Sequence, residues 1–158
     1  MWLLMNMYDR MRAMVIRNLS LLEQGGHGSE LLISRTVTTH TPGTGTVTKV
    51  TTVYKTTALR NNYRNFDLTN SSIKETDVNF YVSPVATTEV PDPDWVPDVG
   101  LGETELDRPL IEVQVDTPEL TTVDKLDFLG KKYTAINVRP WNHAGVSIGF
   151  KVQGRVAA

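Results

Sequence analysis

The chain of 158 residues contains no cysteine. Disulfides, thiolate nucleophiles and zinc–thiolate sites are therefore excluded, and the composition fits a reducing cytoplasm. No apolar run is long enough to span a bilayer. Residues 1–5 are apolar, but no basic segment accompanies them, so they make a poor signal peptide. The length suits a single domain, residues 1–158, with one modest core.

The sequence also has few groups that are arranged for catalysis. Its three histidines, His27, His40 and His143, stand far apart, and we expect loop histidines rather than a shared metal site. No serine lies in a G-x-S-x-G elbow or an S-x-x-K helix. No pair of carboxylates is singled out for glycoside hydrolysis. We therefore expect no enzyme activity, no metal and no cofactor.

Charge is unevenly divided along the chain, although the formal net charge is only −2. Residues 1–64 hold eight Lys or Arg against three acidic residues, a balance of +5, whereas residues 65–158 hold eight against fifteen, a balance of −7. Such polarity favours head-to-tail packing of like subunits, because basic and acidic faces attract each other. An unevenly charged, solvated surface is the alternative interpretation.

Residues 6–24 have the pattern of an amphipathic helix, with apolar side chains recurring every three or four residues. Asn6 is a suitable N-cap, and Gly25 and Gly26 supply a left-handed stop. The methionine-rich stripe indicates core packing or, because methionine adapts to irregular surfaces, a subunit interface. The candidate contact residues of this helix are Met7, Arg10, Met11 and Arg17.

Residues 30–85 are predicted to contain the first strands. Eleven threonines lie between Thr36 and Thr57 among valines and a tyrosine, a composition that fits a pleated, half-buried surface. We expect strands over 31–37, 47–59 and 73–85. The turn between the first two strands is not a phosphate loop, because no Lys-Ser/Thr pair follows its glycines. The candidate contact residues at this hairpin tip are Thr41, Gly43, Thr44 and Thr46.

Residues 86–109 are rich in proline and acidic side chains. Four prolines and two glycines disfavour regular strand pairing over most of this stretch, so we expect an extended loop or arm. Its acidic residues do not form an EF-hand loop, because Val96 and Pro97 occupy positions that require a ligand and a glycine. Trp95 indicates that the arm has a surface to bury against. The candidate contact residues are Asp92, Asp94, Trp95 and Asp98.

Residues 110–156 are predicted to form the C-terminal strands. We expect strands over 111–115, 132–138 and 146–156, with a turn over 140–145. In the last strand, apolar side chains from Val146 to Val152 alternate on one face, and we expect Gly149 and Gly154 on the other, near a bulge or a close neighbour. One helix followed by six or seven strands predicts a mainly β fold. The expected architecture is a small β-barrel of about six strands with an N-terminal α-helix and a long acidic, proline-rich loop.

Several short motifs follow one another in a fixed order along the chain. They are Y-D-R at 8–10, P-G-T-G at 42–45, G-x-x-Y at 130–133, V-x-P at 138–140 and A-G at 144–145. An alternating strand ending at Arg155 follows the last of them. With these motifs in this order, the chain resembles the head-closure, or stopper, proteins at the portal–tail junction of tailed bacteriophages. The resemblance covers nearly the whole chain except the acidic loop.

The resemblance implies a structural virion protein of the phage neck that is assembled in the host cytoplasm. The implied partners are further copies of the chain in a ring of about six or twelve, the portal or adaptor protein on one side, and the tail or tail-terminator protein on the other. Head completion and retention of packaged DNA would be its role, with the acidic loop either lining the channel or clasping a neighbour. A tail-completion or adaptor subunit of the same junction is the nearest alternative.

Two binding functions of other classes have candidate residues in the sequence. A β-sandwich carbohydrate-binding module would use Trp95 and Trp141 as stacking platforms. Recognition of nucleic acid by sequence is disfavoured, because the chain is acidic overall and has no groove-reading motif. Non-specific proximity to packaged DNA is still expected. The basic and aromatic residues available for it are Arg10, Arg12, Arg17, Arg60, Tyr63, Arg64 and Phe66.

Overall fold

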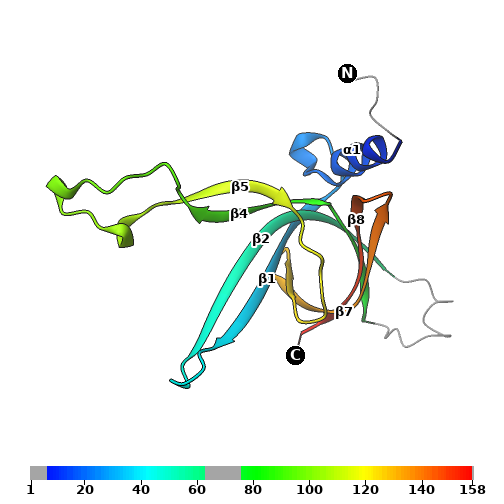
Figure 1. Ribbon diagram of the computed structural model, residues 1–158. Coiled ribbons are helices and arrows are strands. Elements are labelled where there is room, and N and C mark those ends of the chain that lie inside the picture. The colour runs from blue at the N-terminus through cyan, green and yellow to red at the C-terminus, as the bar shows by residue number, and fades with distance from the viewer. Residues whose placement is uncertain (1–6, 63–75, 158) are drawn as a thin grey trace.

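The computed structural model describes residues 7–62 and 76–157. In this part of the chain one α-helix is followed by eight strands, with three short 3-10 turns between them (Figure 1). The elements are α1 (Met7–Leu19), η2 (Leu22–Gln24), β1 (Ser29–His40), β2 (Val47–Asn62), β3 (Val78–Val82), β4 (Val85–Pro91), η3 (Val99–Leu101), η4 (Glu105–Asp107), β5 (Leu110–Asp116), β6 (Lys125–Phe128), β7 (Lys131–His143) and β8 (Val146–Val156). The fold is mainly β with an N-terminal helix, which confirms the prediction from the sequence.

Six of these strands close into a barrel in the order β1-β6-β7-β8-β3-β2, and the direct pairing of β1 with β2 completes the ring (Figure 1). Every neighbouring pair around the ring is antiparallel. Closure satisfies the backbone groups that an open sheet would leave at its edges. The small β-barrel expected from the sequence is confirmed.

Inward-facing side chains of the barrel strands fill its interior. The ring of Phe80 lies at the centre, 5.2 Å from the ring of Phe128 and 5.1 Å from that of Tyr133, measured between centroids. The other large side chains that are completely buried here include Leu31, Ile33, Val82, Leu126 and Val152. Because aromatic and aliphatic groups occupy the axis, the barrel is a solid core rather than a channel.

An ion pair holds the loop between β5 and β6 against the barrel. This loop inserts Leu120 into the core, where its side chain is buried. Arg35 on β1 donates from Nε and Nη2 to the carboxylate of Asp124, at 2.9 and 2.8 Å, and from Nη2 to the carbonyl oxygen of Glu119 at 2.6 Å. The hydrogen bonds to Asp124 raise the pKa of Arg35 against the opposing effect of burial. The fully buried Asp124 therefore has a fixed cationic partner.

A second buried carboxylate joins the segment before β3 to the end of β8. Asp77 accepts hydrogen bonds from Nε and Nη2 of Arg155, at 2.8 and 2.9 Å, and from Nε2 of Gln153 at 2.8 Å. The bonds to Asp77 raise the pKa of Arg155. Two bidentate arginine–carboxylate pairs thus add fixed contacts beside the apolar core.

The helix is shorter than the sequence pattern predicts. It ends at Leu19 rather than at residue 24, and Gly25, with φ of 89°, caps the following 3-10 turn instead of α1. The cause is a fold-back of the chain onto the end of the helix. A Cβ atom on Gly28 would lie 1.9 Å from the carbonyl oxygen of Leu19, so only glycine fits at this approach. The predicted N-cap, Asn6, lies outside the described residues.

Most predicted strands are present, with altered limits. β1 and β2 are both longer than expected, and the predicted residues 73–75 lie outside the described part of the chain. The strand expected over 132–138 extends to His143, with Pro140 paired to Phe150 inside it. Only Ala144 and Gly145 form the turn, both with positive φ (50° and 78°), as in a tight type I′ hairpin.

The two glycines of β8 lie on opposite faces, so the expectation that both lie on the outer face is wrong for Gly154. Side chains alternate along a strand, and Gly154 therefore shares the inner face with Val152. A Cβ atom on Gly154 would lie 2.6 Å from Cε2 of Phe80. Gly149 lies on the outer face of the barrel, where an added Cβ atom would lie 3.9 Å from Cγ1 of Val15 in α1. It stands beside the predicted bulge, where β7 and β8 shift register.

Residues 86–91 were expected in the acidic loop but form most of β4. This strand pairs with β5 over its whole length and with β2 through Thr87 and Thr88. The alternation of buried and exposed side chains along β4 outweighs its nearness to the prolines. Pro91 stands at the end of the ladder, where a missing N–H group is tolerated best. Residues 92–109, with η3 and η4, complete the connection between the two strands.

The position of Gly154 generates a test of core packing. We expect Gly154→Ala to lower the free energy of unfolding by about 1–3 kcal/mol, because the new methyl group would overlap the Phe80 ring. Gly100→Ala, in the exposed η3 turn, is the matched control and is expected to change stability by less than about 0.5 kcal/mol. Urea denaturation followed by fluorescence measures both. Equal stability of the two variants would contradict the packing described.

The ion pair between Arg35 and Asp124 generates a second test. Arg35→Met would leave the buried carboxylate of Asp124 without its cation, and we expect a loss of about 2–3 kcal/mol, reduced from a fully buried pair because solvent reaches Arg35. Arg139→Met, which alters an exposed arginine on β7, should change stability by less than about 0.5 kcal/mol. Thermal and urea unfolding give the comparison. A loss for Arg35→Met no larger than that of the control would show that the ion pair is dispensable.

Candidate interaction surfaces

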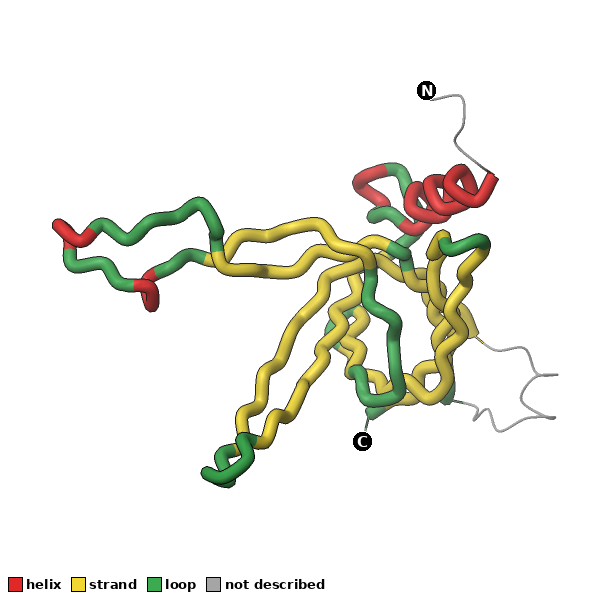
Figure 2. The backbone as a smooth tube through the Cα atoms, viewed as in Figure 1, coloured by secondary structure: helices red, strands yellow, loops and turns green. Residues whose placement is uncertain are grey.

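Two hairpins project from the barrel in different directions (Figures 1 and 2). One is the distal part of β1 and β2, residues 35–53, which we call the ribbon. The other is formed by β4, β5 and their connection, residues 85–116, which we call the arm, with residues 92–109 as the arm tip. Projections of this size on a small barrel make the surface, rather than an enclosed pocket, the first candidate for function.

The ribbon has two strands and, among the described residues, no third strand beside it. Barrel pairing of β1 with β6 ends at Ser34, and pairing of β2 with β4 begins at Tyr54. Along the ribbon, Val37 lies directly opposite Val50, and their side chains are 54% and 56% exposed. An isolated two-stranded ribbon is marginally stable in water. Cover from another chain would therefore stabilise it.

The end of the ribbon brings the predicted hairpin-tip residues together. Thr41, Gly43, Thr44 and Thr46 are all exposed there. The N–H group of Thr41 donates to the carbonyl oxygen of Thr46 at 2.9 Å, and Oγ1 of Thr44 donates to Oγ1 of Thr46 at 3.0 Å. Gly43 has φ of 92°, which the turn requires. The tip is a compact, uncharged turn suited to contact.

The arm tip is ordered by hydrogen bonds of its own. Arg108 donates to the carbonyl oxygens of Asp92 and Trp95, pairs with the carboxylate of Glu105 at 2.8 Å, and lies 5.3 Å above the Trp95 ring. The carboxylate of Asp98 accepts from the N–H group of Gly100 at 3.0 Å. Arg108 thus links both sides of the connection between β4 and β5, so that the arm tip has a fixed shape before any partner binds.

The predicted arm residues serve this order in different ways. Asp92 and Asp98 accept backbone N–H groups within the tip, and Trp95 is half-buried beneath Arg108. Asp94 has an exposed side chain. The sequence pattern did not reveal the apolar part of the tip, because its aliphatic residues lack a helix or strand period. The exposed aliphatic residues there are Val96, Val99, Leu101 and Leu106.

The helix divides its residues between the barrel and solvent. Towards β8, Arg12 donates to the carbonyl oxygen of Ser147 at 3.1 Å and pairs with Asp116 at 2.7 Å. The predicted contact residues Met7, Arg10 and Arg17 are exposed, whereas Met11 is half-buried. Met14, which the prediction did not include among the contacts, is exposed on the same face. Helical spacing places residues 7, 10, 14 and 17 on one face, but only the packing of α1 on β8 shows that this face, the outer face of α1, is the exposed one.

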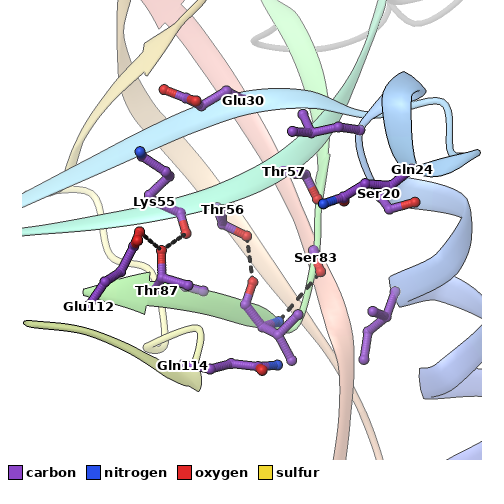
Figure 3. Close-up of a pocket in the computed structure, with 14 residues that line it drawn as sticks. Ser20, Gln24, Glu30, Lys55, Thr56, Thr57, Ser83, Thr87, Glu112 and Gln114 are labelled. Carbon is purple, nitrogen blue, oxygen red and sulfur yellow. Dashed lines mark hydrogen bonds between the residues drawn. The ribbon is translucent and has the colours of Figure 1, made fainter. Parts of the chain in front are cut away.

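A cavity of about 420 Å³ lies between the end of α1, β2, β4 and β5 (Figure 3). Two of the threonine hydroxyls in its lining form hydrogen bonds within the fold: Oγ1 of Thr56 donates to the carbonyl oxygen of Val85 at 2.7 Å, and Oγ1 of Thr87 to the carboxylate of Glu112 at 2.9 Å. A second cavity of about 490 Å³ lies where the ribbon and the arm diverge.

Histidine and carboxylate groups are scattered over the described surface. Within residues 7–62 and 76–157, no three His, Asp or Glu side chains are grouped to hold a metal ion. His27 lies in the turn after η2 and His40 at the end of β1, both exposed, and His143 is the last residue of β7. In the same part of the chain, no helix has the length and apolar character needed to cross a bilayer.

The described residues proposed for the two alternative binding functions lie on several different elements. Trp95 lies on the arm tip and Trp141, 44% exposed, on β7, so they belong to separate elements of a barrel rather than to one face of a sandwich. Of the predicted basic set, Arg10 and Arg17 are exposed on α1 and Arg60 on β2. Tyr63, Arg64 and Phe66 lie outside the described residues.

Comparisons of the chain with protein-family models, with curated proteins and with solved structures find no match. The surfaces described above are therefore the features that bear on function. Three of them share one property: the ribbon, the arm tip and the outer face of α1 all expose large apolar side chains on ordered backbone. Large apolar side chains exposed together on projecting elements indicate protein–protein contact.

The organising role of Arg108 can be tested by hydrogen exchange. Arg108→Ala removes its bonds to Asp92, Trp95 and Glu105, and we expect amide exchange to become roughly tenfold faster or more within 92–109. Exchange in the barrel should be unchanged, because the arm tip lies outside its core. Arg60→Ala, which alters an exposed arginine on β2, is the control. Unchanged exchange in the arm tip would refute a tip ordered by Arg108.

Proposed function

We propose that this chain is a structural subunit of the neck of a tailed bacteriophage, a head-completion or stopper protein that acts in a homomeric ring. The observation that carries the proposal is the pairing of a small solid barrel with two ordered hairpins that expose apolar side chains. A barrel with a filled core needs no partner for its own stability, so its projections are available for contacts between subunits.

The charge distribution supports assembly of like subunits. The outer face of α1 and the ribbon belong to the basic part of the sequence, and the arm belongs to the acidic part. Opposite charges on separate projections favour a repeated head-to-tail contact over a symmetric pair of identical patches. The motifs that resemble stopper proteins supply the location: the portal or adaptor on one side of the ring and the tail on the other.

The helix and strand content also helps to choose between the stopper, adaptor and tail-completion roles at this junction. By the resemblance, adaptors are more often largely helical, whereas here one helix accompanies eight strands. We therefore favour a stopper over an adaptor, with tail completion as the second candidate. Packaged DNA would pass through the centre of the ring, where contacts are non-specific and an acidic surface repels phosphate.

The mass of the protein in solution tests the proposal. We expect either a closed ring or a monomer that enters a ring when the portal or adaptor complex encoded in the same genome is added. Light scattering after size exclusion measures both states. A monomer that does not join any portal or tail preparation would refute the neck function. In that event, intrinsic fluorescence titration with polysaccharides would test the carbohydrate-binding alternative.

A further inference from the structure

The arm tip is built as a docking element. Val96, Val99, Leu101 and Leu106 are 78%, 84%, 77% and 96% exposed, on backbone that Arg108 and Asp98 hold by hydrogen bonds. Large exposed apolar groups on an ordered projection mark a contact site rather than a solvated loop. Because the shape is formed in advance, binding would lose little further conformational freedom.

The charge of the arm tip indicates the kind of surface that it meets. Residues 92–109 hold six acidic residues, namely Asp92, Asp94, Asp98, Glu103, Glu105 and Asp107, against Arg108 alone, a balance of −5. Aliphatic groups within an acidic rim require a partner with apolar contacts at its centre and cations around them.

The outer face of α1 has this chemistry. Met7 and Met14 are 63% and 56% exposed, and Arg10 and Arg17 alternate with them at helical spacing on the same face. Neither arginine forms an ion pair within the described residues. Methionine side chains adapt to irregular apolar partners, and both arginines are available for carboxylates.

The two surfaces of one chain do not meet each other. Figure 1 shows the arm leaving the barrel on one side, while α1 lies across β8 on another, and Figure 2 shows the same separation. A contact between them therefore requires a second copy. Because donor and acceptor surfaces differ, each copy can use both, and the contact repeats from copy to copy until a ring closes.

We infer that the arm tip of one copy docks on the outer face of α1 of the next copy, with Leu106 and Leu101 against Met7 and Met14, and with tip carboxylates near Arg10 and Arg17. The inference rests on the proposed ring assembly and specifies its contact. It assigns the acidic arm to clasping a neighbour rather than to lining the channel.

The absence of cysteine allows a direct test by cross-linking. Leu106→Cys and Met14→Cys are prepared separately, mixed at high concentration and treated with a short bismaleimide. We expect the mixture to give a linked dimer at least about fivefold more efficiently than either variant alone, because the contact is heterologous. The double variant should give a ladder of higher species. A mixture of Leu106→Cys with Val123→Cys, an exposed site on the loop between β5 and β6, is the matched control.

Charge exchange provides the second measurement. Asp94→Lys and Arg17→Glu should each weaken self-association in sedimentation by roughly threefold to tenfold, and the chain carrying both substitutions should recover most of it. Both positions are exposed and have no role in the barrel core, so folding is not at issue. Recovery in the double variant supports the contact. Additive weakening, or no cross-link above the Val123 control, overturns it.

Failure of this contact and failure of the neck function have different signatures. If the wild-type chain forms rings and the arm and helix variants form them equally well, the arm–helix contact is refuted. The neck function is unaffected by that result. A chain that cross-links as expected but never joins a portal or tail preparation would keep the contact and refute the neck function.

Discussion

The pairing between β1 and β2 is the constraint on which the rest of the structure depends. The first part of this ladder, from Ser29 opposite Ala58, closes the six-stranded ring, and its continuation to His40 opposite Val47 forms the ribbon. On its other edge, β2 pairs first with β4 and then with β3. A single strand therefore sets the register of the barrel, the direction of the ribbon and the starting point of the arm. A shift of one residue in β2 would move Ala58 from the core face to the solvent face and bring Leu59, which is now exposed, to the core face.

Within this frame, apolar packing and buried ion pairs have separate tasks. Phe80, Tyr133 and the surrounding aliphatic side chains hold the barrel together. The Arg35–Asp124 and Asp77–Arg155 pairs fix the segments that enter and leave it. A buried carboxylate tolerates only an arrangement that supplies its cation and donors, so these pairs specify position more than they add stability. Beyond Arg35, the ribbon lies outside both systems, as does the arm tip, and the hydrogen bonds of their turns are local.

The sequence allowed the barrel to be predicted because its signals are periodic. Alternation in 146–156 and the threonine-rich stretches located β8, β1 and β2 closely. Besides the extension of β7 through Pro140 to His143, three features escaped prediction, each for a physical reason. The helix ended early because Gly28 packs on Leu19, a tertiary approach with no local signal. Residues 86–91 joined β4 because a strand partner distant in sequence outweighed nearby prolines. Gly154 lies in the core because the Phe80 ring occupies the space that a side chain at this position would need.

The candidate contacts were predicted as regions rather than as surfaces. Composition indicated the hairpin tip, the acidic stretch and the methionine-rich helix, and all three are exposed in the fold. It did not show that Met14 rather than Met11 shares the outer face of α1, since that depends on which side packs on β8. Nor did it show that Arg108 and Trp95 form the centre of the arm tip, because a cation above an aromatic ring joins residues with no pattern between them.

The filled interior of the barrel has a consequence for any closed assembly of this chain. With Phe80, Tyr133 and Leu120 occupying its axis, the subunit itself transmits nothing from one end to the other. Any lumen must lie between subunits, and its diameter follows from the number of copies and the reach of their projections. Mutations that enlarge or shrink the core would alter stability without changing that aperture, whereas a change in copy number would alter the aperture while leaving every subunit folded as before.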